Sequence, residues 1–91
     1  MTKAELVSKI AEQTGYDRVT VLNVVEEMMT QVKASVSSNE SVFLRGFGSF
    51  ITKTRKEKIA RNIKAETTIV VPEHKIPAFK PAKVFMEQVK K

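Results

Sequence analysis

Apolar residues recur every three or four positions over the first third of the chain, which predicts two helices. The first helix begins at a capping box formed by Thr2 and Glu5, in which each side chain satisfies a free amide of the first turn. Its apolar face follows at helical spacing through Val7 and Ile10. Gly15, which adopts positive φ easily, is expected to end it.

The second helix is predicted over residues 18–36, with Asp17 as its N-cap. It carries two apolar stripes, which are Leu22, Val25, Met29, Val32 and Val36, and Val21, Val24 and Met28. Together the stripes cover more of the helix than one short neighbour needs. A central helix of a monomer is one interpretation. Because a chain this short has little other core, a helix shared with a second subunit is favoured.

The pattern then becomes strand-like, after a loop at residues 37–41. Residues 42–44 are expected to begin one strand, residues 45–48 to form a tight turn, and Phe50 to lie in the next strand. Phe47 lies between two glycines, where an exposed aromatic ring is unfavourable. We therefore expect it to fill a hydrophobic pocket, either in a partner subunit or, as the alternative, within its own chain.

From residue 52 onward the alternation loses its apolar side, so charge would lie on both faces of a strand. Such a strand cannot lie inside a packed sheet, and it must project into solvent or not be a strand. The β-prone residues 67–71 are the expected return strand. The prediction is a β-ribbon arm over about residues 53–75, with residues 62–65 at its tip.

Prolines divide the last quarter of the chain. Pro72 and Pro77 are expected to mark bends, since neither can donate to a ladder, and residues 76–79 to form a short strand that rejoins the sheet. Pro81 suits the first turn of a last helix. The predicted order is two helices, four strands and one helix.

Charge changes this picture, because the net charge of +6 is concentrated in one segment. Residues 53–64 hold six basic residues and one acid, Glu57. This asymmetry favours an anionic partner, with a solvated basic surface as the alternative. The chain has no Cys and a single His, so no disulfide or metal site is expected. It shows no membrane span and no secretory signal, which favours a cytoplasmic location.

The chemistry-bearing residues disfavour an enzyme. Besides the single His74, the acids are scattered, and the glycines at 46 and 48 do not begin a phosphate-binding loop. The basic run does differ from a solvated tail, because Ile63 follows Arg61 and Asn62. An apolar side chain can wedge between base pairs while Arg and Asn contact the groove of a bent duplex.

Three motifs together resemble the bacterial histone-like HU/IHF family over essentially the whole chain. They are R-G-F-G-S-F at 45–50, the basic arm with Arg55, Lys58, Arg61 and Asn62, and I-P-A-F-K-P-A-K at 76–83. The resemblance implies an α+β fold and an intertwined dimer. Each subunit would have two N-terminal helices, a three-stranded antiparallel sheet with a protruding β-ribbon arm, and a short C-terminal helix. It also implies binding in the DNA minor groove, DNA bending and organisation of the bacterial nucleoid. Ile63 stands where the family usually carries the intercalating proline.

We therefore expect a single domain at residues 1–91, with a helical dimerisation base at 1–40, a sheet with its arm at 41–80 and a helix at 81–91. The residues expected to contact DNA are Lys3, Lys53, Arg55, Lys56, Lys58, Arg61, Asn62, Ile63, Lys64, Lys75, Lys80 and Lys83. The residues expected to build the core and the dimer interface are Val25, Met29, Leu44, Phe47, Phe50 and Phe79.

The expected partner is double-stranded DNA, with bent, nicked or cruciform forms as candidates, bound by a homodimer with little sequence specificity. No cofactor, metal, membrane or small-molecule substrate is expected. The alternatives are a site-specific IHF-like subunit, which could pair with a paralogue, and an RNA-binding basic protein.

Overall fold

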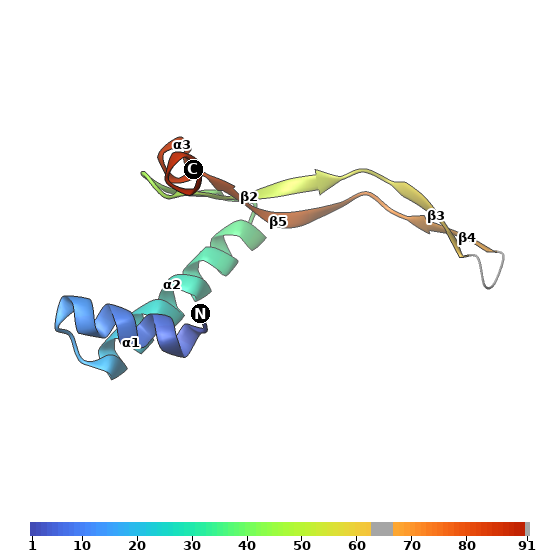
Figure 1. The fold of residues 1–91 in the computed structure, drawn as a ribbon. Helices are drawn as coiled ribbons and strands as arrows, with labels where there is room; N and C mark the ends of the chain where they lie inside the picture. Colours follow the sequence, from blue (N-terminus) through green and yellow to red (C-terminus); the bar gives the residue numbers. More distant parts are fainter. Residues whose placement is uncertain (63–66, 91) are drawn as a thin grey trace. The chain divides into compact units, whose positions relative to one another are not determined.

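The computed structural model describes residues 1–62 and 67–90, with residues 60–62 and 67 described by their backbone alone. It contains three helices and five strands, in the order α1 (Lys3–Thr14), α2 (Arg18–Ser37), β1 (Val42–Leu44), β2 (Gly48–Arg55), β3 (Lys58–Asn62), β4 (Thr67–Val71), β5 (His74–Pro81) and α3 (Lys83–Val89) (Figure 1). The chain divides into two compact units, Met1–Ala34 and Ser35–Lys91.

The predicted ends of α1 are confirmed. The hydroxyl of Thr2 accepts a hydrogen bond from the backbone N–H of Glu5 at 3.2 Å, which caps the first turn. The other half of the predicted capping box differs, because the Glu5 carboxylate accepts from the Thr2 hydroxyl at 3.2 Å and not from the Thr2 backbone N–H. Gly15 ends the helix with φ of 81°, and its N–H donates to the carbonyl of Ala11 at 2.9 Å.

The start of α2 is also as predicted. One carboxylate oxygen of Asp17 accepts from the backbone N–H groups of Val19 and Thr20, at 2.9 and 3.2 Å. The other oxygen accepts from the Thr20 hydroxyl. These bonds satisfy amides that have no partner within the helix, which is why the helix begins here.

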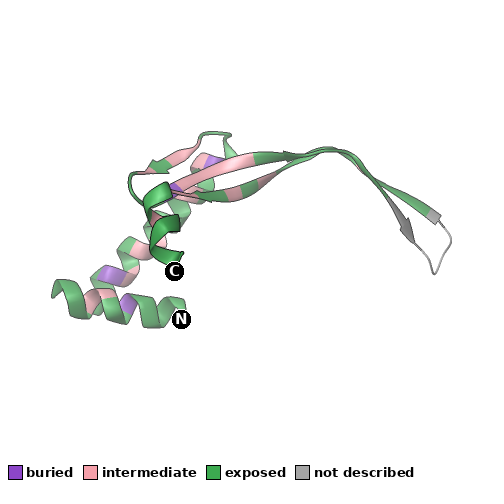
Figure 2. Cartoon of the chain, turned by 45° about the horizontal axis from the view of Figure 1, so that its top comes forward, coloured by how far each residue is buried: buried purple, intermediate pink, exposed green. Residues whose placement is uncertain are grey.

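Few apolar side chains are buried in the single chain. Among the described residues the buried ones are Val7, Val21 and Val36 (Figure 2). Of the two residues of α2 predicted for the dimer interface, Val25 is half-buried and Met29 is 40% exposed. The second stripe of α2 remains open at Val24 and Met28.

Polar bonds within the second unit fix the loop that leads into its sheet. Asn39 has a left-handed backbone conformation, with φ of 65°. Asparagine is one of the few residue types besides glycine that adopt this conformation readily. Its side-chain carbonyl accepts from the Thr52 hydroxyl at 2.8 Å. The Ser35 hydroxyl donates to the carbonyl of Glu40 at 2.9 Å, which closes the turn that leads into β1.

The second unit contains an antiparallel sheet of three strands, as predicted, and the structure gives their order as β1-β2-β5. The turn at 45–47 is closed by a bond from the Phe47 N–H to the carbonyl of Leu44 at 2.9 Å. The register places Phe50 between Val42 of β1 and Phe79 of β5. One face of the sheet therefore carries the aromatic core.

Two of the proline predictions were wrong. Pro77 does not mark a bend, because it lies inside β5 opposite Thr52. Pro81 is the last residue of β5, opposite Gly48, and α3 begins at Lys83 with Ala82 as N-cap. Proline is tolerated here because β5 is an edge strand of this sheet, with one side of its backbone outside the ladder. The Ala82 N–H donates to the carbonyl of Phe47 at 2.9 Å, which holds the start of α3 against the turn.

The long strands are interrupted, so the described chain has five strands where four were predicted. Residues 56–57 separate β2 from β3, and residues 72–73 separate β4 from β5. Pro72 lies in the second break, as expected of a bend. β3 and β4 pair antiparallel from Lys58–Val71 to Asn62–Thr67, and Figure 1 shows this two-stranded ribbon continuing beyond β2 and β5.

Candidate nucleic-acid interface

The cations of the arm begin within the three-stranded sheet rather than beyond it. Lys53 and Arg55 are paired with Ile76 and His74 in the β2–β5 ladder. Because strand side chains alternate between faces, Lys53 and Arg55 share one face, whereas Lys75 lies on the other. All three cations are exposed, as are Lys56 at the break and Lys58 at the start of β3. The end of the ladder is thus cationic on both faces.

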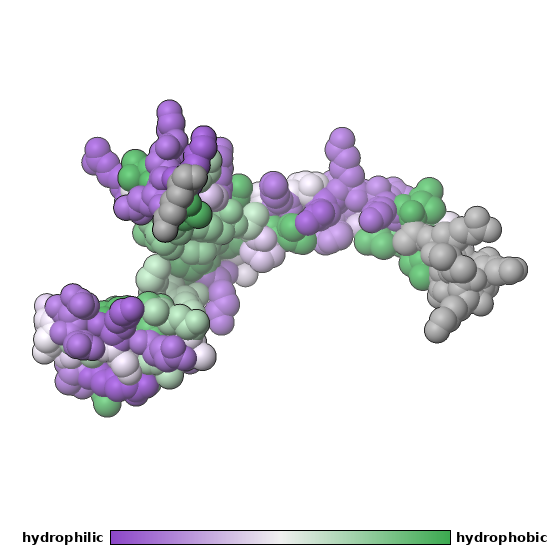
Figure 3. Space-filling model, viewed as in Figure 1, coloured by the Kyte–Doolittle hydropathy of each residue, from purple (hydrophilic) through white to green (hydrophobic). Residues whose placement is uncertain are grey.

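The two strands of the ribbon differ in charge. β3 carries Lys58 and Arg61, whereas β4 contains no charged residue. Ile59 lies opposite Val70, and both are exposed, at 69% and 55%. Figure 3 shows the corresponding mixture of hydrophilic surface and small hydrophobic patches along the ribbon. The ribbon therefore offers both charge and apolar surface to a partner.

Several predicted site residues lie at the limit of the described chain. The backbones of Arg61 and Asn62 belong to β3, so Asn62 ends a strand instead of forming part of the tip. Ile63 and Lys64 lie outside the described residues, and their predicted roles stay predictions.

Lys80 and Lys83 are exposed near the aromatic core. Lys80 lies on β5 opposite Ser49, on the face that carries Lys53, and Lys83 is the first residue of α3. The two lysines extend the cationic surface from the arm to the far end of the sheet.

Four phenylalanine rings hold that end of the sheet together. Phe47 contacts Phe79 with ring centroids 5.1 Å apart and stacks on Phe85 at 5.5 Å. Phe50 contacts Phe79 at 5.0 Å. Phe47 nevertheless remains 44% exposed and Phe79 38%. Within one chain Phe47 has a pocket of its own, and its exposed part is open to a further contact; Leu44, also predicted for this core, is half-buried.

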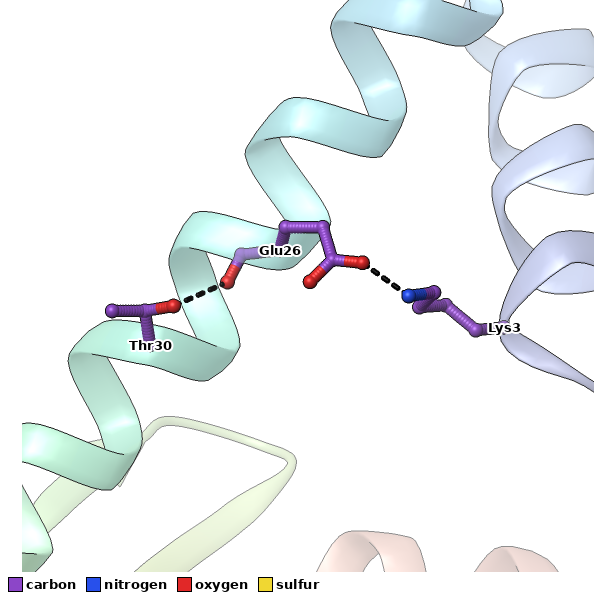
Figure 4. Close-up of polar contacts among 3 residues, drawn as sticks. All are labelled: Lys3, Glu26 and Thr30. Atoms are coloured by element: carbon purple, nitrogen blue, oxygen red, sulfur yellow. Dashed lines mark hydrogen bonds and ion pairs between the residues drawn. The ribbon is translucent and has the colours of Figure 1, made fainter.

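Lys3 belongs to the first unit, and its charge is compensated there. Its ammonium group forms an ion pair with the Glu26 carboxylate of α2, while the Glu26 carbonyl accepts from the Thr30 hydroxyl at 3.1 Å (Figure 4). Both side chains of the pair are about half exposed, at 51% and 47%, and such pairs contribute below about 1 kcal/mol. Lys3 is thus held by Glu26 only weakly.

Sequence reasoning missed three features of this surface. Glu26 was not assigned to Lys3, since residues 23 positions apart give no local signal. The pattern predicts a last helix but does not indicate that its Phe85 stacks on Phe47. The pattern places Phe43 in the middle of a strand but does not indicate that its side chain is 76% exposed.

No helix in residues 1–62 and 67–90 combines the length and apolarity needed to cross a membrane.

Comparison with known proteins identifies the family. The profile of the family described as "Bacterial DNA-binding protein" matches residues 1–90. The SPbeta prophage-derived DNA-binding protein HU 2 of Bacillus subtilis is 36% identical, over 99% of this chain and 98% of its own length. Integration host factor subunit beta of Pseudoalteromonas translucida is 37% identical, over 98% of this chain and 95% of its own.

The fold is shared with a solved HU protein. The HU subunit of a cocrystal with DNA from Anabaena superposes with a TM-score of 0.94 at 34% identity, covering 99% of this chain and 98% of that one. The α+β fold with its antiparallel sheet is therefore confirmed. The chain belongs to the bacterial DNA-binding protein family that includes HU and the integration host factor subunits.

Proposed function

We propose that this protein acts as a homodimer that binds double-stranded DNA through the minor groove, bends it and organises the bacterial nucleoid. The observation that carries the proposal is the exposed cationic ladder that leads into the β3–β4 ribbon. Its described cations are Lys53, Arg55, Lys56, Lys58 and Lys75. Lysine and arginine on both faces suit the phosphates that border a groove on either side.

The charge of the ladder predicts how DNA affinity depends on salt concentration and on base sequence. Each phosphate that a cation neutralises releases condensed counterions, so affinity falls with salt with a log–log slope of about −0.9 per contact. A dimer carries two ladders, and roughly six contacts would give a slope of about −5. Binding to phosphates carries little sequence information, which supports a protein with little sequence preference.

A dimer is supported by the apolar surface of the first unit. Val24 is 63% exposed, Met28 46% and Met29 40%, on a helix of which only Val21 and Val36 are buried. Apolar patches of this kind mark protein interfaces more often than free surface. Phe47, with its exposed portion, and Val25 are the further residues we assign to the interface.

The minor groove is favoured by the composition of the ribbon. Exposed Ile59, Ile69 and Val70 accompany its cations, and proteins that open the minor groove combine cations with apolar wedges. We keep Ile63, outside the described residues, as the wedge. Substitution Ile63→Ala is expected to reduce the bend of a short duplex more than the affinity, and an unchanged bend would reject that role.

The proposal is tested by competition at fixed salt between linear, nicked and cruciform DNA, with the oligomeric state measured alongside. We expect a dimer that binds all three, with distorted DNA preferred because part of the bending energy is already supplied. A salt series on linear DNA belongs to the same experiment, and a flat log–log plot would contradict the cationic ladder as the binding element.

A site-specific function is the second candidate, because an integration host factor subunit beta is among the relatives at 37% identity. That function predicts strong preference for one duplex in excess competitor DNA. RNA binding is addressed with an RNA duplex as competitor, since A-form RNA presents a wide, shallow minor groove that a narrow ribbon fits poorly.

A further inference from the structure

One row of side chains crosses all three strands of the sheet on the face away from the aromatic core. Phe43 of β1 lies opposite Ser49 of β2, and Ser49 lies opposite Lys80 of β5. Directly paired residues of an antiparallel sheet point to the same face. Phe43 and Lys80 therefore share a face, separated by two strand spacings, or about 10 Å.

Phe43 is the unusual member of this row. It is 76% exposed, more than any other phenylalanine of the described chain. Its neighbours in β1, Val42 and Leu44, point to the other face and are half-buried. In the described chain the close ring pairs join Phe47, Phe50, Phe79 and Phe85 to one another, and none involves Phe43. The fold of the single chain thus gives this ring no packing partner of its own kind.

The rest of the face shows what the ring would meet. Along β2 the same face continues through Ile51 to Lys53 and Arg55, and along β5 it includes Lys80. Ile51 is half-buried, whereas the three cations are exposed. The face is therefore continuous with the cationic ladder, and its charge is complementary to an anionic polymer rather than to a basic or neutral protein surface.

We propose that Phe43 is a DNA-contact residue, whose ring packs against deoxyribose and base edges in the minor groove while Lys80 neutralises a phosphate at the border of that groove. The inference rests on the proposed function and extends it from the ribbon to the face of the sheet. The long, flexible side chain of Lys80 lets its ammonium group reach a phosphate at the border of the groove that the ring enters.

The contact would also give the protein a mild base preference. In the minor groove a G·C pair presents the guanine amino donor, which an A·T pair lacks. An apolar ring offers that donor no acceptor and removes it from water, so G·C under the ring is disfavoured. Phe43 would thus favour A·T pairs at its own position, without any hydrogen bond.

The test is a salt series of DNA affinity for the full chain and three variants, Phe43→Ala, Lys80→Ala and Val89→Ala. An apolar contact releases no counterions, so Phe43→Ala should weaken binding at every salt concentration by the same factor, at least roughly fivefold, with the slope unchanged. Lys80→Ala should instead make the slope shallower by about 1 to 2 for two subunits. Val89 is 69% exposed on α3, away from this face, so Val89→Ala is the matched apolar control and should bind like the unsubstituted protein.

A second arm compares A·T-rich with G·C-rich duplexes of equal length. The unsubstituted protein should prefer the A·T-rich duplex, and Phe43→Ala should reduce that preference. Thermal unfolding and sedimentation of Phe43→Ala should match the unsubstituted protein, because an exposed ring contributes little to the core.

Three outcomes would overturn the inference. Phe43→Ala could bind as tightly as the unsubstituted protein, or change the salt slope, or shift sedimentation towards monomer because a partner subunit covers the ring. Failure of the proposed function is a separate result, since the unsubstituted protein itself would then show no salt-dependent binding to DNA.

Discussion

Gly48 is the residue at which the sheet leaves no room for a side chain. A Cβ atom built there would lie 2.6 Å from the carbonyl oxygen of Lys80 and 2.6 Å from the ring of Phe79. Gly46, two residues earlier, has φ of 79° but nothing within 4 Å of the same position. The two glycines of the turn are thus required for different reasons, one for space and the other for backbone conformation.

The difference is measurable by urea unfolding. Gly48→Ala should lower the free energy of unfolding by about 3 kcal/mol or more, because the strand or the Phe79 ring has to move. Gly46→Ala should lower it by only about 1 kcal/mol, the cost of a left-handed conformation for a residue with a Cβ. Equal effects of the two substitutions would show that close approach at Gly48 is not limiting.

Asp17 links the stability of α2 to pH. The Thr20 hydroxyl and the backbone N–H groups of Thr20 and Val19 donate to its carboxylate and hold its pKa below the ordinary value. A folded-state pKa below the unfolded one stabilises the fold above the unfolded value, and this contribution is lost as pH falls through the folded value. We therefore expect the melting temperature to decrease once the pH is lowered below about 4, and part of that decrease to come from protonation of Asp17.

Asp17→Asn is the matched control for that prediction. Asparagine keeps the N-cap oxygen but does not titrate, so the variant should lose less stability than the unsubstituted protein between about pH 4 and pH 2. Identical pH profiles of the melting temperature would show that Asp17 has no part in the acid response.

At the scale of secondary-structure elements, the cationic ladder and the ribbon are the parts to which we assign DNA binding. Lys58 and Arg55 lie on β3 and β2, on opposite sides of the break at residues 56–57. Each variant, Arg55→Ala or Lys58→Ala, removes two cations from a dimer. Each should therefore make the log–log salt slope of DNA binding shallower by up to about 1.8.

Lys33→Ala on α2 is the control for these charge deletions, because Lys33 is exposed but outside the predicted DNA surface. It should leave the slope unchanged. A slope that changed equally in all three variants would mean that DNA responds to total charge and not to the ladder.

Local rules predicted the elements that local interactions determine. The caps at Thr2, Gly15 and Asp17 are side-chain or backbone bonds within a few residues, and the structure contains them. Pro81 fits both a helix start and an edge strand, and only the pairing with Gly48 decides between them. The long strands are interrupted at residues 56–57 and 72–73, which face each other, and the periodicity of the sequence does not show these breaks.

The type of binding site could be predicted from the sequence, whereas the contacts and the exposure of individual residues could not. The basic run indicated a charged ribbon, and the described cations of the ladder are exposed as expected. The pairing of Lys3 with Glu26 and the exposure of Phe43 result from tertiary placement. The sequence contains all three residues, but local patterns do not show which distant residues lie near Lys3 or whether anything covers Phe43.

At the scale of the whole molecule, the question is how a chain with three buried valines among its described apolar residues, Val7, Val21 and Val36, remains folded. A second subunit would cover Met28 and Met29, and folding would then be coupled to association. For a dimer that unfolds to monomers, the melting temperature should rise with protein concentration, measured by calorimetry from micromolar to millimolar. A melting temperature independent of concentration would contradict an obligate dimer.

Met29→Glu places a charge in the proposed interface and should shift sedimentation towards monomer and lower the melting temperature. Asn23→Glu introduces the same charge at an exposed position of the same helix and should have a small effect on both. A dimer that tolerates Met29→Glu would place the interface elsewhere on the chain.

The facing breaks at residues 56–57 and 72–73 have a consequence for proteolysis. They leave β3 and β4 as a separate two-stranded sheet, and two strands alone are at best marginally stable in water. Trypsin cleaves after lysine and arginine, and Arg55, Lys56 and Lys58 are exposed in or beside this sheet. Brief digestion of the free protein should therefore cut here first, and a bound duplex should delay these cuts far more than cuts after the lysines of the helices.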